Sequence, residues 1–282
     1  MIRPFFRAAA VAAVVALVVV PVALADGPYG NPDPNPNPGP TAQEAAALAQ
    51  KQQVATDYVL ARKGLFPVAA AKAEMATIAG ATAVVSPMAS AGGVLGMSQF
   101  PQQYNYYCGA SASYSILRYR GATTGPRGES LSQTHLAAYC TTGYLCTEAD
   151  QGTPWYQSAA YPHPVPSTLN TWAHSTWYMA QDGATNFSTN LTFDIDNGYP
   201  LALNVYEKAS SSTPHLVGHP TNIEIYHWVA ASGYGSYGAT TYYADPVHGS
   251  SVSWAGSVPA YSYIASGSTG MSYMLATRGF VW

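Results

Sequence analysis

Charged residues are scarce in this chain. Lysine and arginine together number 11 and aspartate and glutamate 14, so 9% of the 282 residues are charged and the formal net charge is −3. A chain without an excess of positive charge lacks the electrostatic attraction that binds the phosphates of a nucleic acid. We therefore expect no nucleic-acid partner. The hydrophobic share of 48% is enough for a substantial core.

Cysteine is rarer still, with three residues in the chain. Cys140 and Cys146 lie close in sequence, and Cys108 stands apart from both. In an oxidising compartment the simplest pairing is a small loop-closing disulfide between Cys140 and Cys146, and an odd count leaves one thiol unpaired. This pairing predicts that Cys108 is free.

Long apolar runs are lacking except near the N-terminus, where residues 1–25 have the form of a signal peptide. Arg3 and Arg7 make a basic start, residues 8–20 are continuously apolar, and Ala23-Leu24-Ala25 is a small-x-small cleavage site. The apolar run is shorter than the ~20 residues that a spanning helix needs. We expect a secreted, extracellular protein, cleaved after Ala25 and without a stable membrane anchor afterwards.

Two segments of biased composition precede the main domain. Residues 26–40 carry proline at every second place over part of their length, which predicts an extended linker. Residues 41–97 are rich in alanine, and Thr41 with Glu44 fits a capping box at the start of a helix that runs to Gly64, with a second helix behind it. This segment is either a removable pro-segment or a helical hairpin docked on the main domain, which we place at residues 98–282.

Helical patterns precede strand patterns in the main domain. A helical period starts at Cys108 and runs to about Tyr119, and residues 132–139 and 167–172 also favour helices. Residues 193–205, 228–231 and 240–244 have strand-like composition and are bounded by glycine and proline. This order predicts an α+β fold in which the N-terminal helices pack on an antiparallel sheet.

Cys108 has the sequence setting of a nucleophile. At the first turn of a helix, unpaired amide donors and the positive end of the helix dipole favour the charged sulfur over the thiol. A buried structural cysteine is the alternative. A nucleophilic thiol also needs a base and a group that orients the base.

His227 and Asp245 are the candidates for these two roles. His227 opens an apolar strand pattern, and Asp245 follows the next strand candidate. Adjacent antiparallel strands joined by a glycine-rich turn bring their far ends together, so we expect the two side chains to be neighbours. His215 and His219 have the spacing of one helix face. Because no glutamate follows His215, the zinc-peptidase motif is absent, and we predict neither a metal nor a cofactor.

Several of these residues together resemble the papain-like cysteine peptidase fold, specifically the double-glycine leader peptidase-like (bacteriocin-processing) group of secreted bacterial proteins. The resemblance covers roughly residues 99–247 and rests on four elements in the order that the group shares: Gln102, Cys108-Gly109, His227-Trp228-Val229 and Asp245-Pro246. The chain departs from the family at Ala110, where proline is common. This departure touches the first helical turn rather than the mechanism.

The resemblance implies a role for each matching residue. Cys108 is the nucleophile, His227 the general base and then acid, and Asp245 the orienting group. Gln102 donates to the oxyanion together with the backbone N–H of Cys108, with Gln103 as the second candidate.

The implied activity is cleavage of peptide bonds through a thioester intermediate. The partner is then a peptide or protein substrate, with cell-wall peptide as one candidate. Two alternatives stay open: a transglutaminase-like acyl transfer, and a non-catalytic peptide- or cell-wall-binding module on the same fold.

Overall fold

The structure is a computed structural model that describes residues 35–81, 91–149 and 151–282. The predicted signal peptide and the first part of the predicted linker lie outside the described residues. Among these residues, the helices are α1 (Ala42–Arg62), α2 (Val68–Met75), α3 (Cys108–Tyr119), α4 (Gln133–Leu136), α5 (Pro164–Trp172), α6 (Phe187–Asp196) and α7 (Met271–Leu275). The strands are β1 (Gly93–Val94), β2 (Ala180–Asp182), β3 (Leu201–Glu207), β4 (Ile225–Gly235), β5 (Thr240–Ala244), β6 (Tyr261–Ala265) and β7 (Gly279–Val281).

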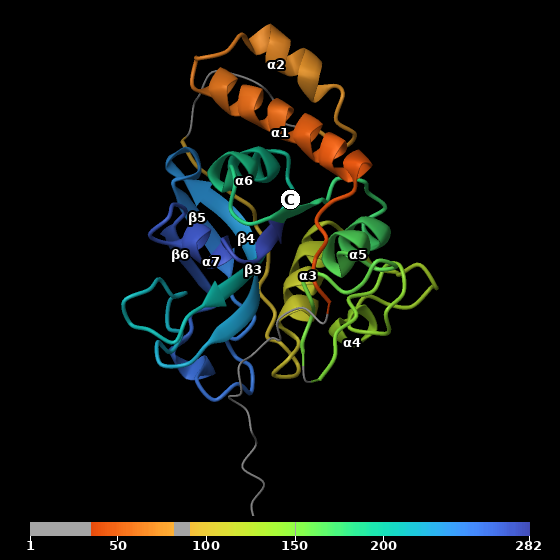
Figure 1. The fold of residues 1–282 in the computed structure, drawn as a ribbon, viewed down its shortest axis with the longest axis vertical. Helices are drawn as coiled ribbons and strands as arrows, with labels where there is room; N and C mark the ends of the chain where they lie inside the picture. Colours follow the sequence, from red (N-terminus) through yellow and green to blue (C-terminus); the bar gives the residue numbers. More distant parts are fainter. Residues whose placement is uncertain (1–34, 82–90, 150) are drawn as a thin grey trace, which may run out of the picture.

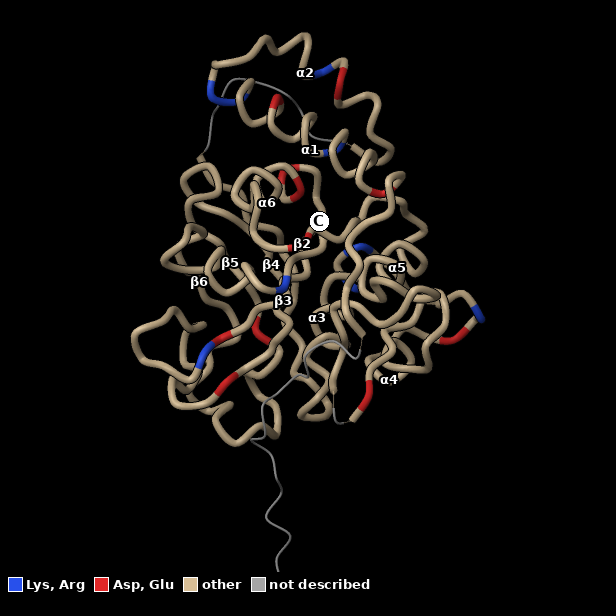
Figure 2. Tube along the Cα trace, in the orientation of Figure 1, with Lys and Arg blue, Asp and Glu red and all other residues tan. Residues whose placement is uncertain are grey.

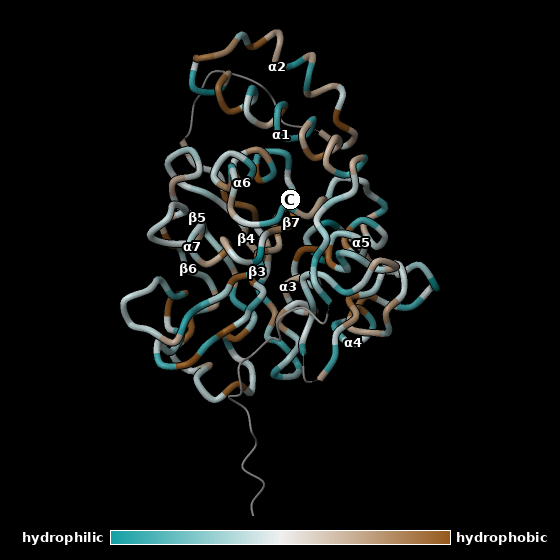
Figure 3. Tube along the Cα trace, viewed as in Figure 1, coloured by the Kyte–Doolittle hydropathy of each residue, from teal (hydrophilic) through white to brown (hydrophobic). Residues whose placement is uncertain are grey.

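An antiparallel sheet forms the centre of the molecule (Figure 1). Its strand order is β2-β7-β3-β4-β5-β6, and β1 pairs with β4. Helix α3 packs against β4 and β3, α6 against β4, and α7 against β3. The two central strands are almost wholly buried because helices cover them. Apolar residues gather along these strands and α3 in Figure 3. The predicted α+β fold with an antiparallel sheet is confirmed.

The N-terminal helices cap one end of the molecule, above α6 (Figure 1). The capping box predicted at Thr41 and Glu44 is present, and α1 runs from Ala42 to Arg62 as its pattern indicates. Lys51 on α1 is buried, donates to the backbone carbonyl of Trp177 at 3.0 Å and lies 3.4 Å from Asp194 on α6. The segment is therefore docked through a buried charge.

The described end of the predicted linker also lies on the main domain. Asn35 donates to the backbone carbonyl of Gln157, and Asn37 donates to the carboxylate of Asp182. Among the residues that the structure describes, no helix has both the length and the apolar character needed to cross a membrane. Among the described residues, lysine and arginine are spread along the trace in Figure 2 rather than gathered in one patch.

The structure corrects three local predictions. Helix α4 spans Gln133–Leu136 rather than residues 132–139, because the Leu136 carbonyl accepts from Leu145, across a loop, instead of continuing the helix. Residues 193–196 belong to α6 and not to a strand, since this helix runs to Asp196, is followed by Gly198 with a φ of 77°, and β3 starts only afterwards. The sheet takes in Gly93–Val94, a few residues before the predicted start of the main domain.

Candidate active site

Cys108 is the first residue of α3 and is buried. Tyr107, at the cap position, makes no side-chain hydrogen bond to the helix end, so the amide donors of the first turn are not taken by a cap. Gly109 is required next to the cysteine, because a Cβ there would lie 2.4 Å from the Cβ of Thr153. A thiol thus sits at an open helix N-terminus, packed closely against the segment around Thr153.

The loop before α3 is tied to the segment that follows β5. The Gln99 side chain donates to the Asp245 carbonyl at 2.9 Å, and the Gln102 backbone N–H donates to the Pro246 carbonyl at 2.8 Å. These bonds join the entry of the cysteine helix to the chain around Asp245. Neither contact is visible in the sequence pattern.

His227 and Asp245 are hydrogen-bonded neighbours, as the strand pattern predicts. His227 lies near the start of β4, β4 pairs antiparallel with β5, and Asp245 directly follows β5. The Nε2 atom of His227 is 3.0 Å from Oδ1 of Asp245, and both side chains are buried. The Cys108 thiol lies close enough to His227 to interact with its imidazole and to help raise the pKa of that ring. Since Nε2 faces Asp245, Nδ1 is the ring nitrogen left for the thiol.

The electrostatics of this group favour a charged imidazole. Burial lowers the pKa of His227, but Asp245 and then Cys108 outweigh burial and raise this pKa to about 10. Burial likewise acts to raise the pKa of Asp245, and the nearby His227 and His219 hold it well below its usual range. An ionised carboxylate thus faces an imidazole that can hold or release a proton beside the thiol.

Comparison with known proteins identifies the family of the chain. A model of the Peptidase_C39-like family matches residues 94–269, which is more than half of the chain. The chain belongs to this family. Its α+β fold is accordingly that of the papain-like C39 group, as the resemblance implies.

Two further comparisons add little to the assignment. A solved structure, named as a C39-like peptidase from Bacillus anthracis, aligns with this C39-like chain at 11% identity and a TM-score of 0.42, over 67% of this chain and 96% of the other. That likeness is too low to bear on the site. Among curated proteins, none matches the chain.

The two glutamine candidates of the C39-like chain differ in burial. Gln102 is buried, and its side-chain amide donates to the backbone carbonyls of Tyr104 and Asn105 at 3.0 and 2.8 Å. Gln103 is exposed, and its side-chain oxygen accepts from Thr134. Both amide hydrogens of Gln102 are thus engaged within its own loop, so donation to an oxyanion would require an exchange of at least one of these bonds.

The predicted disulfide is wrong for this structure. Cys140 and Cys146 both carry free thiols, and so does Cys108. Burial, together with a side-chain hydrogen bond to Cys140, raises the pKa of the Cys146 thiol. Cys108 differs from the other two cysteines because it lies beside His227, and not because the other two form a disulfide.

Sequence reasoning missed a second buried layer behind Asp245. The sequence pattern suggested only a metal-ligand role to consider for His219. In the structure its ring lies 2.9 Å from Asp245, and Glu207, at the end of β3, lies on the other side of the His219 ring. The signal available in the sequence was a glutamate at the end of an apolar strand. His219, His227 and Asp245 have ligand atoms within 4.8 Å of one another. The hydrogen bonds between these side chains account for that proximity.

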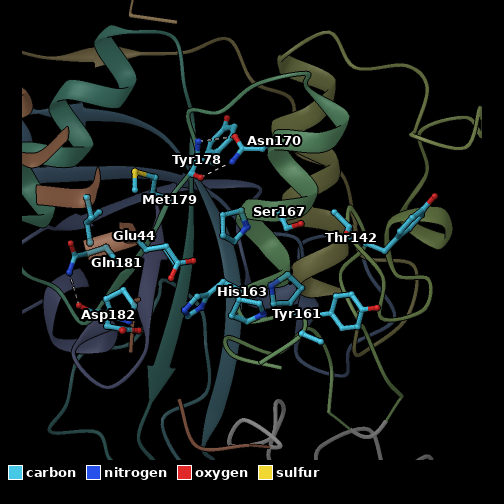
Figure 4. A pocket seen from close by; sticks show the side chains of 18 of the residues that line it. Glu44, Thr142, Tyr161, His163, Ser167, Asn170, Tyr178, Met179, Gln181 and Asp182 are labelled. Carbon is cyan, nitrogen blue, oxygen red and sulfur yellow. Dashed lines mark hydrogen bonds between the residues drawn. The ribbon is translucent and has the colours of Figure 1, made fainter. Parts of the chain in front are cut away.

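A cavity of about 460 Å³ lies elsewhere, between the start of α1 and α5 (Figure 4). Glu44, Tyr161, His163 and Asp182 are among the residues that line it, and Cys108, His227 and Asp245 are not. In Figure 4, dashed lines join Asn170 to the backbone of Tyr178 at one wall. The cavity is separate from the cysteine–histidine–aspartate group.

Proposed function

We propose that the chain is a secreted cysteine peptidase-like hydrolase that cleaves amide bonds with Cys108 as nucleophile. The hydrogen bond between His227 and Asp245 at 3.0 Å, with the Cys108 thiol interacting with the same imidazole, is the observation that carries this proposal. Thiol, imidazole and carboxylate in this order are the parts of nucleophilic acyl transfer. Membership of the C39-like family supports the same chemistry.

The reaction follows from the placement of these groups. His227 takes the proton of the Cys108 thiol, and the thiolate attacks the carbonyl carbon of the substrate amide. The backbone N–H of Cys108, at the open end of α3, stabilises the resulting oxyanion, and Gln102 is the side chain next to join it. His227 then protonates the leaving amine, so the C–N bond breaks and a thioester remains. Water, deprotonated by His227, hydrolyses the thioester and returns the thiol.

The first test compares the wild-type protein with Cys108→Ala and Cys140→Ala. Each protein is incubated with a mixture of peptides of varied sequence, and new peptide termini are identified by mass spectrometry. We expect cleavage by wild type and Cys140→Ala, and none by Cys108→Ala. Cleavage that survives in Cys108→Ala contradicts the proposal.

A second arm separates hydrolysis from the alternatives. Added primary amine intercepts the thioester of an acyltransferase and gives amide products, whereas a hydrolase gives free carboxylates. A binding module gives neither product. It also leaves Cys108 no more reactive toward iodoacetamide near neutral pH than an ordinary exposed thiol.

We also propose that the protein acts outside the cell on a peptide or protein substrate, with cell-wall peptide as one candidate. The basic start, apolar run and small-residue cleavage site in residues 1–25 support this location. N-terminal sequencing of protein recovered from the culture medium tests it, and the expected first residue is Asp26. The same measurement shows whether residues 41–97 remain attached.

A further inference from the structure

His219 lies on the side of Asp245 that faces away from His227. Its Nε2 atom is 2.9 Å from Oδ2 of Asp245, and its Nδ1 atom is 2.8 Å from Oε1 of Glu207. All three side chains are buried. The imidazole ring also packs edge-on against Trp254, with 4.6 Å between the ring centroids. One histidine therefore bridges two buried carboxylates.

This geometry determines the charge of His219. An ionised carboxylate only accepts hydrogen bonds, whereas a neutral imidazole has one donor and one acceptor. A ring with a carboxylate at each nitrogen must donate from both, and only the imidazolium does so. Burial acts to lower the pKa of His219, but Glu207 and Asp245 outweigh burial and raise it to about 9. The ring is therefore a cation near neutral pH.

The row of alternating groups continues beyond Glu207. Oε2 of Glu207 accepts from Nδ1 of His215 at 2.9 Å, and the hydrogen bond to Glu207 raises the pKa of His215. Tyr243 is a further titratable group near Glu207 and Asp245, and burial raises its pKa to about 12, so it is neutral at pH 7. Acid and histidine thus alternate in the order Cys108, His227, Asp245, His219, Glu207, His215.

We infer that His219 is a positioning residue for the proposed reaction, whose imidazolium holds the second oxygen of Asp245 and offsets its negative charge. The inference rests on the proposed function of Cys108 and His227. An uncompensated Asp245 would hold the proton on His227 more tightly. Release of that proton to the leaving amine is the step that a tightly held proton slows. His219, kept charged by Asp245 and Glu207 together, is thus placed to ease proton transfer from His227.

The direction of the charge effect can be tested with two substitutions of opposite sign. His219→Gln removes a cation near His227, so we expect the titration midpoint of His227 to rise by about one pH unit. Glu207→Gln removes an anion while Asp245 still holds the proton on His219, so the midpoint should fall by about as much. The double variant restores the charge balance, and its midpoint should return close to that of wild type. His135→Gln, at an exposed histidine of α4, is the matched control.

Two quantities are measured. The titration midpoint of His227 comes from NMR of labelled histidines, and the rate of Cys108 alkylation by iodoacetamide comes from peptide mass mapping. Cleavage assays add kcat and KM, and we expect His219→Gln to lower kcat about tenfold with little change in KM. A purely structural role predicts that both single variants lose activity and that the double variant loses more. Equal His227 midpoints in wild type, the two single variants and the double variant overturn the inference.

A measurement on the wild-type protein covers the case in which a variant fails to fold. Labelled His219 should show both ring nitrogens protonated at pH 7, and a neutral His219 at that pH also overturns the inference. The two proposals fail separately. Wild-type Cys108 that reacts no faster than Cys140 contradicts the peptidase proposal, whereas fast Cys108 alkylation with an unmoved His227 midpoint contradicts only the role of His219.

Discussion

Thr153 links the residues that follow the two reactive side chains. Gly109 comes directly after Cys108, and its Cα hydrogen points at the Thr153 side chain, where a Cβ would be 2.4 Å away. Trp228 comes directly after His227, and its indole N–H donates to the Thr153 carbonyl at 2.8 Å. One buried residue therefore contacts the neighbours of both the thiol and the imidazole. This contact explains why glycine follows the cysteine.

Gly109→Ala should destabilise the protein by about 1–3 kcal/mol, because the added methyl group overpacks against a Cβ that cannot rotate away. Thermal unfolding measures the effect, and Cys108 alkylation should slow as the helix start shifts. Gly96→Ala is the matched control, since a Cβ at Gly96 meets no atom within 4 Å. An unchanged melting temperature for Gly109→Ala would show that the segment around Thr153 yields easily.

At the scale of elements, the short helix α4 holds the loop that leads into α3. Oε1 of Gln133 accepts from the Gln103 backbone N–H at 3.0 Å, and Nε2 donates to the Pro101 carbonyl at 2.8 Å. The same Nε2 lies 3.4 Å from the Ser111 hydroxyl on α3. One buried amide thus joins three parts of the chain around Gln102.

Gln133→Ala should cost about 1–2 kcal/mol of stability, since the backbone groups of Pro101 and Gln103 lose their partners. It should also slow alkylation of Cys108, because the loop that carries Gln102 loosens. Thr134→Ala, at the exposed neighbouring position, should leave both quantities near wild type. Chemical denaturation and alkylation rates measure the two effects. If Gln133→Ala alkylates at the wild-type rate, α4 does not position the loop.

At the scale of the whole molecule, a buried ion pair attaches the N-terminal helices. Burial lowers the pKa of Lys51 to about 8 against the pull of Asp194, and burial raises the pKa of Asp194 to about 6 against the pull of Lys51. The Lys51 ammonium also lies 4.4 Å from the Trp177 ring centroid and 4.3 Å from that of Trp282. Burial thus makes both charges costly, and each depends on its partner.

Removal of one partner should therefore be worse than removal of both. We expect Lys51→Met to destabilise the protein by about 3–5 kcal/mol, because Asp194 is left buried without a counter-ion. The double variant Lys51→Met/Asp194→Asn should recover most of this loss. Urea unfolding gives both values. A double variant as unstable as Lys51→Met would mean that the aromatic contacts of Lys51, not its charge, hold α1 in place.

The row of histidines should make stability fall in alkaline solution. His219 and His227 have pKa values raised to about 9 and about 10 from 6.5, so their stabilising contribution is complete below pH 6.5 and is lost as pH rises through 9 to 10. Lys51 has the opposite effect, because its pKa is lowered to about 8 and the cost of burying its charge is relieved as pH rises above 8. The difference in melting temperature between wild type and His219→Gln isolates the contribution of His219, and we expect this difference to shrink between pH 7 and pH 10. Melting temperatures across that range measure it.

Local patterns in the sequence were enough for the main elements of the site. The helix start at Cys108, the strand after His227 and the position of Asp245 behind β5 each follow from residue period, turn residues and caps within a short stretch. The sequence also predicted that His227 and Asp245 are neighbours, because adjacent antiparallel strands leave little choice of register.

Only the tertiary structure decided which distant groups meet. Glu207 and His219 come from the end of β3 and from the loop before β4, and nothing local predicts that they stack behind Asp245. The free thiols of Cys140 and Cys146 likewise depend on how the chain places two sulfurs, which spacing alone leaves open. Secondary structure is governed by near neighbours in sequence, whereas the pairing of buried charges depends on packing between elements far apart along the chain.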